Sequence, residues 1–76
     1  MVLLVTEQEF SRRFATAIRR WRGRLNMEVE EFAEFVGIGE RTIYYYEQGR
    51  RMPQLYTAML IAEKLGISLD DLLRGE

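Results

Sequence analysis

Hydrophobic residues recur at intervals of three and four along most of the chain, which is the spacing of helices that bury one face. The first such stretch predicts a helix from about residue 7 to residue 25. Thr6 and Glu9 have the spacing of a capping box at its start. Its apolar face is expected to comprise Phe10, Phe14, Ala17, Ile18, Trp21 and Leu25. Four arginines are expected on a solvated face instead, with phosphate contact as the alternative: Arg12, Arg13, Arg19 and Arg20.

Two shorter helical stretches follow, and each ends close to a glycine. The first is expected over about residues 28–36, with Gly37 just past its end, and it would bury Phe32, Ala33 and Val36. The second is expected over about residues 40–47, and it ends before Gly49. Two short helices joined by a tight turn indicate a helix-turn-helix over about residues 28–47, whose second helix can enter the DNA major groove.

The second of these helices has two distinct sides. Ile43 and Tyr46 are expected to face Ile38 and the core. The opposite side is a candidate surface for reading DNA, and it carries Arg41, Tyr44, Tyr45 and Gln48.

The remaining chain predicts two more helices. Pro53 can begin the fourth, because its missing N–H falls among the unpaired donors of a first turn. Its expected buried stripe is Leu55, Ala58, Met59, Ala62 and Leu65, and Gly66 ends it. Ser68 is a candidate N-cap for a short fifth helix that contributes Leu69, Leu72 and Leu73. Five helices with short connections predict a compact all-α fold in which residues 1–76 form a single domain.

Composition narrows the chemistry. The 76 residues are 47% hydrophobic and 30% charged, and they include no cysteine and no histidine. Disulfides, zinc-finger ligand sets and histidine-dependent catalysis are therefore excluded, and we expect no cofactor, no metal site and no enzymatic activity. The apolar run at residues 2–5 is too short to span a membrane, so we expect a cytoplasmic protein. We expect the segment from Val2 to Val5 to fold back and cover the core, with a contribution to a dimer surface as the alternative.

Charge is distributed unevenly along the chain. The formal net charge is -1, which gives no global attraction to phosphate. Residues 1–26 nevertheless contain six arginines and two glutamates, whereas residues 27–48 contain six glutamates and one arginine. This segregation permits a local basic surface.

A series of residues resembles the lambda-repressor-like, Xre-type helix-turn-helix family of bacterial and phage regulators. The resemblance covers about residues 15–73, nearly the whole chain. The matching residues, in the family's order and spacing, are Arg22, Met27, Phe32-Ala33, Gly37-Ile38, Ile43, Glu47-Gln48-Gly49, Pro53, Ile61-Ala62 and Leu65-Gly66-Ile67.

The resemblance implies roles for individual residues. Arg22 and Glu47 would form a structural ion pair that holds the recognition helix. Base contacts would come from Glu40, Arg41 and Tyr45. Backbone phosphates would be contacted by Thr42, Tyr44, Arg50 and Arg51.

The chain also departs from the family pattern. Glu28 and Gly39 stand where small capping residues are usual, and Val29 replaces a glutamine that contacts phosphate in the family. These departures predict DNA binding that is weak, strongly salt-dependent or dependent on a partner.

Tyr56 and Leu60 lie one turn apart at positions where the family usually has polar residues, so we expect them at a homodimer interface. The favoured function is a sequence-specific regulator that binds double-stranded DNA as a homodimer. The alternative is a protein-interaction module, or an antitoxin-like protein, that keeps the fold with weak or no DNA binding.

Overall fold

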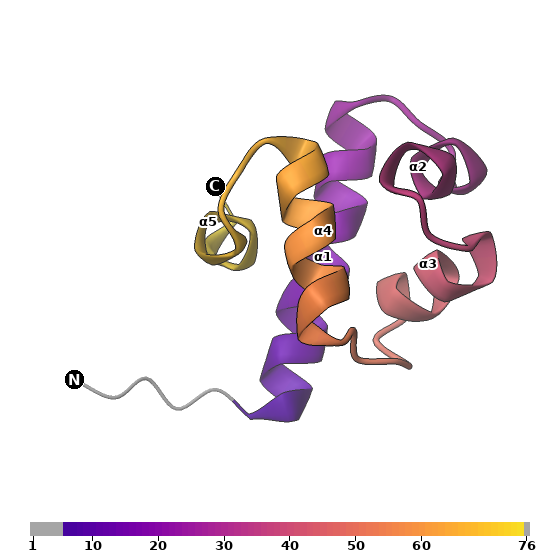
Figure 1. The fold of residues 1–76 in the computed structure, drawn as a ribbon. Coiled ribbons are helices and arrows are strands. Elements are labelled where there is room, and N and C mark those ends of the chain that lie inside the picture. The colour runs from indigo at the N-terminus through magenta and orange to yellow at the C-terminus, as the bar shows by residue number, and fades with distance from the viewer. Residues whose placement is uncertain (1–5, 76) are drawn as a thin grey trace.

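The computed structural model describes residues 6–75 and contains five α-helices, with no strand in that range. They are α1 (Glu7–Arg24), α2 (Val29–Val36), α3 (Glu40–Glu47), α4 (Leu55–Leu65) and α5 (Leu69–Arg74). Figure 1 shows their arrangement. The all-α, five-helix expectation is confirmed. The expected role of Val2 and Val5 concerns residues outside the described range.

The longest helix, α1, is the central element of the fold. It packs against both α3 and α5, which lie on different sides of the molecule in Figure 1. Helix α2 packs against α3 and α4, and α4 packs against α5. Within residues 6–75, no helix combines the length and the apolar character that crossing a bilayer requires.

One hydrophobic core joins all five helices. Phe14 of α1 meets Tyr46 of α3 edge to face, with ring centroids 5.4 Å apart and planes at 78°. Phe10 stacks on Phe14 at 6.0 Å, and this aromatic row attaches α3 to α1. The largest fully buried side chains are Phe14, Phe32, Ile18, Ile43, Ile61, Leu72 and Val36.

Local hydrogen bonds define where several of the helices begin and end. Thr6 Oγ1 accepts from Glu9 N at 3.0 Å, and Ser68 Oγ accepts from Asp71 N at 3.0 Å, so both predicted N-caps are confirmed. The end of α1 is a Schellman motif, in which Met27 N donates to the carbonyl of Arg22 at 3.0 Å. Asn26 takes the left-handed position with φ 56°. Because the chain reverses there, α1 ends at Arg24 and Leu25 is exposed rather than part of the apolar face.

The fourth helix differs most from expectation. Gln54 is the N-cap of α4, so Pro53 lies before the helix instead of in its first turn. Leu55 and Met59, expected in the buried stripe, are exposed. The buried side consists of Ala58, Ile61 and Ala62. The cause is that most residues of α4 are apolar, so the positions of the neighbouring helices decide which side of α4 is buried.

Candidate nucleic-acid interface

A three-residue turn joins α2 to α3. Gly37 has φ 76°, a left-handed conformation that side chains disfavour, and Ile38 N donates to the carbonyl of Ala33 at 3.0 Å. Ile38 packs against the core, and Gly39 is the N-cap of α3. This turn directs α3 across α2 and places the first residues of α3 at the surface.

Helix α3 buries one side and leaves the other accessible. Ile43, Tyr46 and Glu47 are buried. Among the predicted base-contacting residues, Glu40 and Arg41 are exposed and Tyr45 is half-buried. Of the predicted backbone-contacting residues in this helix, Tyr44 is exposed and Thr42 is half-buried. The accessible side therefore combines a guanidinium, a carboxylate, a hydroxyl and two phenols.

The loop after α3 carries Arg50 and Arg51, both exposed. The Arg50 guanidinium lies over the Tyr45 ring, 5.4 Å from its centroid. Arg51 lines a groove together with Thr42 of α3 and Gln54 before α4. The structure thus brings the loop arginines beside the accessible side of α3.

Tyr46 fixes the buried side of α3. Burial of its phenol raises the pKa of Tyr46 above the ordinary 10.0, while nearby Arg51 and a hydrogen bond with Thr57 act in the opposite direction. The ring that packs on Phe14 is therefore kept neutral.

An ion pair connects α1 with the end of α3. Arg22 Nε donates to Glu47 Oε2 at 2.7 Å, and Arg22 Nη2 donates to Glu47 Oε1 at 3.1 Å. Arg22 Nη1 also donates to the carbonyl of Met27 at 3.1 Å, which includes the α1–α2 loop in the same network. The hydrogen bond with Glu47 raises the pKa of Arg22. Because Glu47 is only 9% exposed, its carboxylate depends on this guanidinium for compensation.

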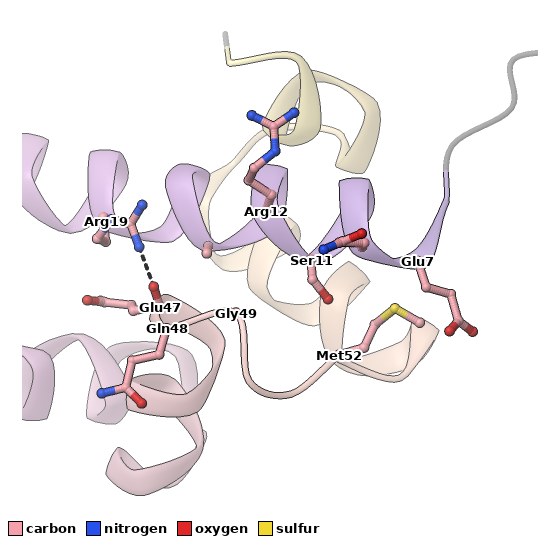
Figure 2. Close-up of a pocket in the computed structure, with 10 residues that line it drawn as sticks. Glu7, Ser11, Arg12, Arg19, Glu47, Gln48, Gly49 and Met52 are labelled. Carbon is pink, nitrogen blue, oxygen red and sulfur yellow. Dashed lines mark hydrogen bonds between the residues drawn. The ribbon is translucent and has the colours of Figure 1, made fainter.

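Arg19 contacts the main chain of Glu47. Figure 2 shows its guanidinium turned toward the carbonyl of Glu47, to which Nη1 donates a hydrogen bond. A cation at this place also faces the negative end of the α3 dipole. Arg19 is exposed, as expected for the solvated face, and it also contacts α3 through this hydrogen bond. Its position three residues before Arg22 places both arginines on the side of α1 that faces α3.

Acidic residues surround the N-terminus of α2. Glu31 accepts from Glu28 N at 2.8 Å, so the carboxylate of Glu31 caps the first turn although Glu28 is an unusual cap. Glu28, Glu30, Glu31 and Glu34 are all exposed. These side chains give one side of the helix-turn-helix a negative surface.

A second surface lies on α4. Leu55, Tyr56 and Met59 are 69%, 74% and 54% exposed. Leu60 is half-buried and lines an apolar groove between α4 and α5 together with Tyr56 and Leu69. Tyr56 therefore stands free on α4, whereas Leu60 is partly covered.

Neither surface offers a metal-binding group. Within the described part of the chain, no three acidic, histidine or cysteine residues are placed to hold a metal ion.

Comparison with known proteins agrees with this geometry. A helix-turn-helix family model matches residues 18–72. An uncharacterized HTH-type transcriptional regulator of Methanothermobacter thermautotrophicus is 45% identical over 51 residues, which are 67% of this chain and 74% of the relative. The cryptic phage CTXphi transcriptional repressor RstR of Vibrio cholerae is 32% identical over 60 residues, which are 79% of this chain and 54% of the repressor.

Other relatives are considerably longer. An HTH-type protein of Methanococcus vannielii is 37% identical over 65 residues, which are 78% of this chain, and the match spans only 20% of its length. Among solved structures, an HTH_3 family transcriptional regulator from Vibrio cholerae superposes with a TM-score of 0.83 at 20% identity, covering 93% of this chain and 40% of the other. At this sequence identity, the superposition supports a shared fold alone. Taken together with the turn, the recognition helix and the ion pair, these matches establish that the chain belongs to the lambda-repressor-like, Xre-type helix-turn-helix family.

Proposed function

We propose that the chain is a transcription regulator of the repressor or controller type, which binds specific sequences of double-stranded DNA with α3 in the major groove. The observation that carries the proposal is the exposure of Glu40 and Arg41 at the start of a helix whose other side is buried. A helix supported in this way presents its N-terminal residues to base edges. A cytoplasmic location accords with this role.

Each side chain on this surface has a role that its chemistry supports. Arg41 can donate two hydrogen bonds to O6 and N7 of guanine, and Glu40 can accept from N4 of cytosine. Tyr45 can pack its ring on a thymine methyl group. Thr42 and Tyr44 have hydroxyls that suit phosphate oxygens.

Positive charge beside α3 supports contact with the DNA backbone. Arg50 and Arg51 are exposed in the loop that follows the recognition helix. Because Arg50 lies over the ring of Tyr45, its guanidinium starts near the proposed base-reading surface. The carboxylates of α2 repel phosphate, which weakens the expected binding, and the arginine–phosphate contacts make that binding sensitive to salt.

We further propose that two copies pair through α4. Tyr56 projects from this helix beside the apolar groove that Leu60 lines, so a twofold axis would place each Tyr56 against the groove of the other copy. Pairing of this kind would present two α3 helices to half-sites roughly 34 Å apart.

The direct test is selection of the purified chain against a random duplex library at near-physiological salt. The proposal requires enrichment of one sequence family by the native chain, and a relaxed base preference at one position for Arg41→Ala. The matched control is Arg13→Ala, which removes an arginine that is paired with Glu9 on α1, and it should leave the selected sequence unchanged. Failure of the native chain to retain any duplex would contradict the proposal.

A second function has its own observation. Phe35 is exposed on α2 among glutamates, and an apolar ring within an acidic surface suits a basic protein partner. In that case the chain would act as an interaction module or antitoxin-like protein with weak or no DNA binding. Retention of duplex DNA that falls steeply with salt distinguishes the two functions, because counterion release accompanies phosphate contact.

A further inference from the structure

Four arginines line a cleft between α1 and α5. Arg12 and Arg13 are neighbours on α1, Arg20 lies about two turns later on the same helix, and Arg74 comes from the end of α5. The cleft has a volume of about 590 Å³, within the range of small-molecule sites. It is separate from the surface of α3 described above.

Carboxylates compensate only part of this charge. Glu9 pairs with Arg12 at 2.5 Å and with Arg13 at 2.8 Å, and Asp70 pairs with Arg74 at 3.0 Å. Three of the four guanidiniums thus share two carboxylates in these pairs. The cluster keeps an excess of positive charge that an anion would neutralise.

Arg20 is the member of the cluster that makes no ion pair with a described residue. Its Nε is buried and has no hydrogen-bond acceptor among residues 6–75. The guanidinium lies against Gly75, where an added Cβ would be 3.4 Å from Arg20 Nη2. Burying an unpaired donor is unfavourable, and an anion seated in the cleft that Arg20 lines would supply a compensating negative charge to its guanidinium.

We propose that this cleft binds a phosphate-class oxyanion carried by a free small molecule. The planar guanidinium fork matches the oxygens of a phosphate group and can donate two hydrogen bonds at once. Several such forks from two helices would surround the anion, so the ligand would connect α1 with α5.

The location argues against DNA as the source of the phosphate. Helices α3 and α5 lie on different sides of α1 in Figure 1, and the cleft is lined by residues of α1 and of the α5 end of the chain. Arg12 lines both this cleft and the pocket drawn in Figure 2, which Gln48 and Gly49 also line, whereas Arg13, Arg20 and Arg74 belong to the cleft between α1 and α5. A duplex held by α3 would lie on the other side of α1.

Thermal unfolding in inorganic phosphate tests the site. Compared with sodium chloride at equal ionic strength, phosphate at up to about 10 mM should raise the Tm of the native chain by several degrees. Arg20→Gln should lose most of this increase. Arg41→Gln removes the same charge from α3 and should retain it. No specific increase in the native chain, or an equal increase in Arg20→Gln, would overturn the proposal.

A spectroscopic titration keeps the test decisive if Arg20→Gln folds poorly. In the ¹⁵N-labelled native chain, phosphate should shift the Nε–H signal of Arg20 and the amide of Gly75 in a saturable manner, and chloride should not. Duplex affinity should be unaffected in Arg20→Lys. A loss of duplex affinity as large as that of Arg41→Gln would overturn the assignment to a free ligand, and unchanged signals in phosphate would overturn the site itself.

Discussion

Arg22 and Glu47, which are 25 positions apart in sequence, form a two-bonded ion pair with Nε and Oε2 at 2.7 Å. Arg19 donates to the backbone carbonyl of the same glutamate, so one residue at the end of α3 is held by its side chain and by its main chain. Helix α3 is therefore tied to α1 at its C-terminal end, opposite to Glu40 and Arg41. The proposed reading of DNA by Arg41 would depend on this support, because α3 has only 8 residues.

Replacing Glu47 by glutamine should lower the free energy of unfolding by about 2–4 kcal/mol, since it leaves the Arg22 guanidinium without its counter-charge. Urea unfolding followed by circular dichroism measures the change. Glu9→Gln breaks only the surface pairs with Arg12 and Arg13 and should have little effect. Equal midpoints for the native chain and Glu47→Gln would contradict the structural role of the pair.

A substitution at Gly23 should increase the stability of the chain, whereas Glu47→Gln should decrease it. A Cβ added there meets no atom within 4 Å, and the residue lies inside α1, so Gly23→Ala should raise stability by about 0.5–1 kcal/mol. Gly37→Ala is the matched control. Its site is equally open, but φ is +76°, and the substitution should therefore destabilise the chain by about 1 kcal/mol. Thermal unfolding of both variants checks the contrast, and a shift of the same sign in both would refute this explanation.

Prediction from sequence succeeded where a local signal was sufficient. Helix α3 has the expected bounds of Glu40–Glu47, because Gly39 and Gly49 frame it and Ile43 and Tyr46 define one apolar side. Two helix starts were likewise predicted from Thr6 and Ser68, whose hydroxyls cap the backbone within three residues.

Prediction failed where the outcome depends on distant segments. Leu55 and Met59 are as apolar as the residues that α4 buries, so their exposure follows from the positions of α2 and α5. The surroundings of two arginines of α1 also depend on distant segments. Arg19 faces the end of α3 and Arg20 faces the end of α5, and no pattern within α1 specifies where those helices end.

Stability should decrease at alkaline pH through Tyr46. Burial raises the pKa of this phenol in the folded chain above its ordinary 10.0, so the stabilisation is complete below pH 10 and is lost as the pH rises through the folded value. Chemical unfolding between pH 8 and about pH 11 should show this loss. Tyr46→Phe cannot ionise and should flatten the alkaline slope. An identical slope in both proteins would assign the alkaline loss to other groups.

The proposed dimer predicts a simple change in mass. Sedimentation equilibrium of the native chain at high micromolar concentration should give twice 9.0 kDa, and Tyr56→Glu should give 9.0 kDa because it puts a charge into the apolar contact. Tyr44→Glu, which alters an exposed tyrosine of α3, should remain dimeric. A native chain that sediments as a monomer would eliminate pairing through α4.

Arg50 and Arg41 should affect DNA binding in different ways. Arg50→Ala removes one proposed phosphate contact, so it should weaken binding to all sequences similarly and reduce the slope of log K against log salt by about one. Arg41→Ala should cost about 1–3 kcal/mol on the selected sequence and relax the preference at one base pair. Titrations of both variants at several salt concentrations, on the selected duplex and on a scrambled one, separate these effects. If Arg50→Ala changed the base preference and left the salt slope intact, the loop arginine would belong to the base-reading surface instead.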